Sequence, residues 1–133
     1  MLKEDCLFCK IIKGEIPCYK IYEDEFVLAF LDINPDSDGH TLIIPKKHYT
    51  DIDDINLDTL TKIFESVKTI KKILEEKLSC DGITLLQNNG NVQEIKHFHL
   101  HLKPQYKNKN SMEIIKHSKY IKDVKVIYDI LKN

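Results

Sequence analysis

The sequence predicts an α+β fold, in which an antiparallel sheet of about five strands carries one long packed helix. Short apolar segments bounded by turn residues recur along the chain, a pattern typical of antiparallel strands. One longer segment has apolar residues at every third or fourth position, which is typical of an amphipathic helix. The length of 133 residues suits one hydrophobic core, so we expect a single domain over residues 1–133.

The first part of the chain predicts a hairpin and a third strand. Residues 19–22 and 26–33 are the expected hairpin strands, joined by a charged turn at 23–25. Residues 40–45 predict the next strand, which ends at Pro45 because proline has no N–H to donate to a sheet.

The helical pattern begins at Leu57 and continues to Leu78, which is about six turns. Asn56 and Asp58 are both residue types that cap the first turn of a helix. We expect the apolar face of this helix to pack on the sheet.

The second part of the chain predicts two further strands and another helix. Residues 83–88 predict a buried strand, and residues 95–102 predict another, in which polar and apolar side chains alternate from His97 to Leu102. A polar loop at 89–94 joins them. A further apolar pattern at 120–131 predicts a helix within a C-terminal extension, residues 106–133.

The charge balance argues against polyanionic and membrane partners. Twenty basic residues, all of them lysine, oppose 21 acidic residues, for a formal charge of −1. We therefore expect no nucleic acid polymer as a partner, and any phosphate must be held by backbone amides, Lys, His or amide side chains. The N-terminus carries Lys3, Glu4 and Asp5 and has no long apolar run, which predicts a cytoplasmic protein without a membrane segment.

Three histidines, His97, His99 and His101, alternate with apolar residues in "KHFHLHLKP". On a strand they share one face, while Phe98 and Leu100 point into the core from the other. Neighbouring histidines are about 6.6 Å apart and could share a zinc ion, but the outer two are about 13 Å apart. A single ion cannot easily bind all three, so we expect them to have different roles.

A structural zinc site is predicted from cysteines and histidines that are distant in the chain. Cys6 and Cys9 form a C-x2-C pair, and with His48 and His97 they make the two-thiolate, two-imidazole set of a closed tetrahedral site. The alternatives are a pair of buried thiols beside a short helix, or a redox pair, although a redox C-x2-C normally follows a strand and opens a long helix.

Several segments in order, over about the first 105 residues, resemble the histidine triad (HIT) family and its Hint-like, zinc-binding bacterial branch. They are "CLFCKIIKGEIP", "FLDINPDSDGHTLIIPKKH", "NNG" followed by Gln93, and "HFHLHLK". The spacing C-x2-C-x38-H-x48-H is similar to that of the zinc-bearing members. The resemblance implies a HIT-like fold that dimerises edge to edge into a continuous sheet.

The resemblance also implies a nucleotidyl hydrolase or transferase. Such enzymes cleave at the α-phosphorus of nucleoside phosphoramidates, acyl-nucleotides or dinucleoside polyphosphates through a covalent nucleotidyl-histidine, here on His99. A main-chain carbonyl beside the third histidine would hold the tautomer of this nucleophile. His101 and His40 would complete the phosphate contacts and the proton relay.

The resemblance assigns the rest of a purine nucleotide site. Asp32 matches the residue that binds the ribose hydroxyls, and Phe30 and Ile33 match the residues that line the base pocket. Asn88 and Gln93 match the amides around the phosphate, and Gln93 is also expected to take part in catalysis. Alternatively, Asp32 caps the turn that follows it, and Asn88 is a turn residue.

Three departures from the family pattern bear on the substrate. Only Asn91 and Val92 separate "NNG" from Gln93, so the phosphate loop is short. Glu94 occupies a position where a serine commonly contacts the phosphate, and Lys103 occupies an apolar position of the signature.

Two other functions are compatible with these residues. One is a non-catalytic nucleotide-binding or adaptor protein. The other is a hydrolase with a catalytic zinc held by His99 and His101.

Overall fold

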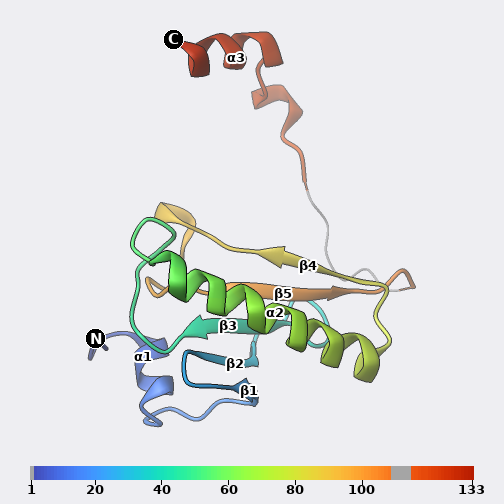
Figure 1. Ribbon diagram of the computed structural model, residues 1–133. Helices are drawn as coiled ribbons and strands as arrows, with labels where there is room; N and C mark the ends of the chain where they lie inside the picture. The colour runs from blue at the N-terminus through green and yellow to red at the C-terminus, as the bar shows by residue number, and fades with distance from the viewer. Residues whose placement is uncertain (1, 109–114) are drawn as a thin grey trace.

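Five antiparallel strands form one sheet in the order β1-β2-β3-β5-β4 (Figure 1). This computed structural model describes residues 2–108 and 115–133. The strands are β1 (Lys20–Glu23), β2 (Val27–Leu31), β3 (Thr41–Pro45), β4 (Gly82–Leu86) and β5 (Leu100–Gln105). The predicted α+β fold is confirmed.

Two helices cover opposite faces of this sheet. The long helix α2 (Leu57–Leu78) packs on one face through Ile63, Ile70 and neighbouring apolar residues. The short helix α1 (Leu7–Ile12) covers the other face, where Phe8 and Cys9 are buried against β2 and β3. Successive residues of a strand point to opposite faces, so β2 and β3 contribute side chains to the apolar packing under α1 and to that under α2.

The predicted bounds of α2 are confirmed, and only one of the two candidate residues caps it. The Asn56 side chain accepts a hydrogen bond of 2.8 Å from the Thr59 N–H. The helix ends at Ser79, whose left-handed backbone (φ 54°) turns the chain toward β4.

The two C-terminal strands differ from their predicted form. The segment 83–88 was predicted as a buried strand, but β4 is an edge strand and Leu85 is 43% exposed. The expected strand 95–102 begins only at Leu100. Before that point the Phe98 N–H donates to the Tyr49 carbonyl at 2.6 Å, so this backbone is held by a loop instead of a neighbouring strand.

The predicted C-terminal helix is present, with shifted bounds. A 3-10 turn (Ser118–Tyr120) precedes α3 (Val124–Lys132), whose N-terminus is capped by Asp123. No residue of α3 is buried, and the helix stands away from the sheet (Figure 1). The predicted extension 106–133 includes residues 109–114, which lie outside the described residues.

No helix in the described parts of the chain combines the length and the apolar character needed to cross a membrane. The assignment of residues 1–133 to a single domain stays a prediction.

Gly39 lies between α2 and β5 at a point where a side chain would displace its neighbours. Its φ of +89° is left-handed, and an added Cβ would collide with the Leu78 side chain and approach Pro104 Cγ to 3.3 Å. Gly14 has a similar φ of +80° with nothing near the Cβ position. An alanine at this position would therefore show the cost of the left-handed backbone alone, without any collision.

We expect Gly14→Ala to lower the free energy of unfolding by about 1 kcal/mol, the cost of a left-handed alanine. Gly39→Ala should cost about 0.5–1.5 kcal/mol more, because the Leu78 side chain must change its conformation and Pro104 must move slightly to make room. Urea denaturation of both variants measures the difference, and equal losses would contradict the packing argument.

Candidate active site and metal centre

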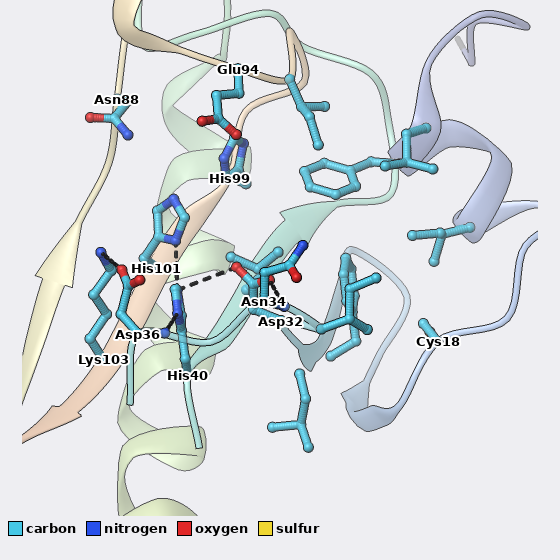
Figure 2. Close-up of a pocket in the computed structure, with 18 of the residues that line it drawn as sticks. Cys18, Asp32, Asn34, Asp36, His40, Asn88, Glu94, His99, His101 and Lys103 are labelled. Carbon is cyan, nitrogen blue, oxygen red and sulfur yellow. Dashed lines mark hydrogen bonds and ion pairs between the residues drawn. The ribbon is translucent and has the colours of Figure 1, made fainter. Parts of the chain in front are cut away.

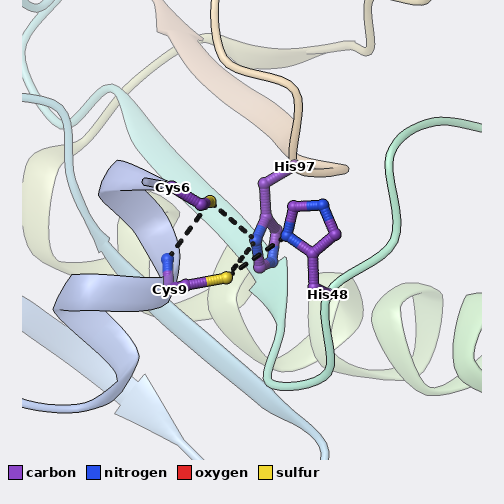
Figure 3. A group of neighbouring side chains, drawn as sticks. All are labelled: Cys6, Cys9, His48 and His97. Carbon is purple, nitrogen blue, oxygen red and sulfur yellow. Dashed lines mark hydrogen bonds between the residues drawn. The ribbon is translucent and has the colours of Figure 1, made fainter. Parts of the chain in front are cut away.

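Cys6, Cys9, His48 and His97 converge on one point between α1 and the sheet (Figure 3). Their potential ligand atoms all lie within 4.8 Å of one another. Sγ of Cys9 is 3.2 Å from Nδ1 of His48 and 3.5 Å from Nδ1 of His97, and Sγ of Cys6 is 3.4 Å from the latter. The structure therefore brings together all four predicted ligands.

The donor set fits a tetrahedral metal ion. Zinc–sulfur and zinc–nitrogen bonds of usual length place these atoms about 3.6 Å apart along each edge of a tetrahedron. The observed sulfur–nitrogen distances are slightly shorter than this. The four residues could hold a metal ion with small outward movements.

His97 is oriented for coordination by a contact on its other nitrogen. Nε2–H donates to the Pro45 carbonyl at 3.0 Å, which leaves the lone pair of Nδ1 directed at the two sulfurs. Burial lowers the pKa of His97 to about 4, so its ring is neutral, as a metal ligand must be.

Local structure positions the cysteines as well. Cys6 is the N-cap of α1, and its sulfur accepts a hydrogen bond of 3.3 Å from the Cys9 N–H. The two thiols thus lie one helical turn apart on the same side of α1. The sequence predicts a short helix here only if the two cysteines are buried thiols without a metal. In the structure the helix is present, and it positions both cysteines as potential metal ligands.

A cavity of about 530 Å³ opens beside this cluster, on the face of the sheet that α1 covers. Most of the residues predicted for catalysis and nucleotide binding line it. They are Phe30, Asp32, Ile33, His40, Asn88, His99 and His101. Segments from β2, β3, β5 and the loop after β4 therefore meet at one site (Figure 2).

Gln93, predicted to bind phosphate and to assist catalysis, is not among the lining residues. Its side chain is buried, and Nε2 donates to the Thr50 carbonyl at 2.6 Å. In this conformation Gln93 connects the short loop to the segment after His48, which is a structural contact.

His99 is buried beside Phe8 and has a defined tautomer. Its Nδ1–H donates to the main-chain carbonyl of His97 at 2.8 Å, so the lone pair is on Nε2. The carbonyl that sets the tautomer thus belongs to the first histidine of the three, whereas the resemblance implied a carbonyl beside the third. Burial lowers the pKa of His99, which favours the neutral ring.

His40 and His101 form a hydrogen-bonded pair whose tautomers can be deduced. Nδ1 of His40 accepts from the Asp36 N–H at 3.0 Å, so His40 carries its proton on Nε2. That proton is donated to Nδ1 of His101 at 2.8 Å. His101 must then carry its own proton on Nε2, which makes it a hydrogen-bond donor.

Asp32 caps the turn that follows it, as the alternative interpretation predicted, and only one of its two carboxylate oxygens is used for this. Oδ1 accepts from the Asn34 N–H at 2.9 Å and closes the turn after β2. Oδ2 is 3.6 Å from Nε2 of His40, too far for a hydrogen bond, and can accept from a ligand.

Two features of the site were not predicted from the sequence. Phe8 packs edge-on against His99, with ring centroids 5.1 Å apart, and so connects the metal cluster to the cavity. Lys103 is 8% exposed, and its Nζ donates to Oδ2 of Asp36 at 2.6 Å. The position of Phe8 between the paired cysteines was a usable signal, but nothing in the sequence pairs Lys103 with Asp36.

Because burial and nearby positive charge lower the pKa of His101 to about 4, we expect it to stay neutral down to about pH 5. The unfolded chain has the ordinary histidine pKa of about 6.5 and binds the proton first, so folding stability should rise between about pH 4 and pH 6.5. Titration of the ring by NMR checks this value. A midpoint near 6.5 would contradict the deduced environment.

The family model described as the HIT domain matches residues 13–108 of the chain. An uncharacterized HIT-like protein of Methanocaldococcus jannaschii is 52% identical over 76% of this chain and 79% of that protein. The adenosine 5′-monophosphoramidase HNT1 of Saccharomyces cerevisiae is 43% identical over 80% of this chain and 66% of that protein.

Solved structures agree with these matches. A HIT family protein from Bacillus anthracis has a TM-score of 0.82 and 39% identity, covering 97% of this chain and 94% of its own. A zinc-bound histidine triad family protein from Mycobacterium smegmatis has a TM-score of 0.78 and 34% identity, covering 85% and 84%. The sequence and the fold together show that this chain belongs to the histidine triad family.

Proposed function

We propose that this protein is a nucleotidyl hydrolase or transferase that cleaves at the α-phosphorus of purine nucleotides through a covalent intermediate on His99. The observation that carries the proposal is the tautomer of His99, whose Nε2 lone pair is free inside the cavity. The name of the yeast relative, an adenosine 5′-monophosphoramidase, supports the reaction class. Phosphoramidates, acyl-nucleotides and dinucleoside polyphosphates all fit this chemistry.

The cavity residues suit a bound nucleoside monophosphate group. Phe30 and Ile33 supply apolar walls for the base, and the free oxygen of Asp32 suits a ribose hydroxyl. Asn88 offers an amide to the phosphate, a useful donor in a chain without arginine. The role proposed for Gln93 is indirect, because it holds the loop that carries Glu94.

In the first step Nε2 of His99 bonds to the α-phosphorus and the bond to the leaving group breaks. The His97 carbonyl accepts from Nδ1–H and stabilises the positive ring that forms. In the second step water attacks phosphorus, the bond to His99 breaks, and the nucleoside monophosphate is released.

His101 and His40 would carry protons for both steps. Nε2–H of His101 can donate a hydrogen bond to a phosphate oxygen. A proton that the neutral pair takes up when the substrate binds can pass from His101 to the departing group, which returns the pair to its neutral state, and the attacking water supplies the proton for the next cycle. The Asp36 N–H keeps His40 in the tautomer that this relay needs.

Zinc is the metal that we propose for Cys6, Cys9, His48 and His97, where it would cross-link α1 to the sheet. A closed set of four protein ligands supports a structural role, and the zinc-bound mycobacterial structure supports the identity. We further propose a homodimer with a continuous sheet, for which β1 and β4 are the available edges. A cytoplasmic location stays a prediction.

His99→Ala should reduce hydrolysis of an adenosine phosphoramidate by at least about 1,000-fold, because the nucleophile is lost. The metal content and the fold should persist, since the substitution leaves the main-chain carbonyl and the ring of His97 in place. Steady-state kinetics measures the loss, and mass spectrometry of the quenched wild type should detect nucleotidylated His99.

The matched control is His117→Ala, a substitution of an exposed histidine outside the cavity. Full activity of a folded His99→Ala variant would refute the mechanism. Nucleotide binding by the wild type without turnover would favour the non-catalytic adaptor function.

Metal analysis of protein purified without chelators should give about one zinc per chain. Cys6→Ser should lose the metal and unfold at a lower temperature, whereas Cys80→Ser, a substitution of a cysteine outside the cluster, should keep it. Undiminished zinc in Cys6→Ser would exclude this site. Loss of activity on metal removal before any loss of fold would favour the catalytic-zinc alternative.

A further inference from the structure

Glu94 lines the cavity beside the proposed nucleophile. Figure 2 shows its carboxylate next to the His99 ring. Across residues 2–108 and 115–133, Glu94 forms no hydrogen bond or ion pair. The nearest lysine in the sequence, Lys96, donates instead to the Gly90 carbonyl at 2.6 Å.

The cavity as a whole carries excess negative charge. Its charged lining residues are Asp32, Asp36, Glu94 and Lys103. Lys103 and Asp36 neutralise each other across 2.6 Å, and burial lowers the pKa of His40 and His101, which favours their uncharged forms. The carboxylates of Asp32 and Glu94 are therefore uncompensated.

These two carboxylates flank His99 from different directions. Asp32 lies beyond His99 on the side of β2 and the His40 pair, while Glu94 lies on the opposite side (Figure 2). If Asp32 binds the ribose, the substituent on the far side of the α-phosphorus extends toward Glu94. The group that departs from phosphorus would then meet a free carboxylate.

We propose that Glu94 selects substrates whose leaving group carries a positive charge, such as an amine with a second, protonated amino group. A leaving group with a carboxylate, sulfate or further phosphates would meet a like charge in a partly enclosed site. This inference rests on the proposed function and narrows its substrate classes to cationic phosphoramidates.

The test uses the full-length protein and adenosine phosphoramidates of three amines of similar length: putrescine, pentylamine and γ-aminobutyrate. Their leaving groups end in an ammonium, a methyl and a carboxylate group. For an exposed carboxylate, wild-type kcat/KM should be roughly tenfold higher for the putrescine substrate than for the γ-aminobutyrate substrate. Added salt should reduce the preference by screening.

Glu94→Gln should shrink this ratio roughly three- to tenfold and leave the pentylamine substrate nearly unaffected. Glu94→Lys should reverse the order. Glu76→Gln is the matched control, because it removes an equal charge from the exposed side of α2, outside the cavity, and should keep the wild-type ratio.

An equal ratio in wild type and Glu94→Gln would overturn the inference, as would a wild type without preference for the cationic substrate. In both cases turnover of the substrates would leave the proposed function standing. A folded, metal-loaded wild type that cleaves none of the three substrates would instead contradict the proposed function itself.

Discussion

The site depends on His97, whose ring and main chain act on different neighbours. Nε2 is anchored to the Pro45 carbonyl, which aims Nδ1 at the two thiols. The main-chain carbonyl of His97 accepts a hydrogen bond from Nδ1–H of His99, which leaves the lone pair of that ring on Nε2. The metal cluster and the cavity are therefore mechanically connected, since a movement of His97 would disturb both.

The same constraint explains why α1 matters despite its six residues. Cys6 and Cys9 tie it to His48 and His97, while Phe8 places its ring against His99 and Phe30. A helix of this length is not stable alone in water, so its packing on the sheet and the contacts of its cysteines must hold it. A metal ion at the cluster would fix one wall of the cavity as well as the fold.

Electrostatics of the cavity follow from burial. Removal from water keeps the histidines neutral, and this gives them lone pairs and N–H donors in defined places. Lys103 is compensated by Asp36, but Glu94 is not. A site built around neutral rings is thus left with negative charge at the end where a leaving group would depart.

The sequence by itself determined the α+β class and the bounds of α2, because the periodicity of apolar residues is a local property. It also determined the four residues of the metal cluster, because their types and spacing form a recognisable pattern. Most of the residues that it predicted for the nucleotide site line the cavity. Only the tertiary structure decided that β4 is an edge, that β5 starts after His99 and that Gln93 turns to Thr50. It also decided that Lys103 is paired with Asp36, while Glu94 has no such partner among the described residues. These outcomes depend on contacts between segments distant in the chain, which no local pattern specifies.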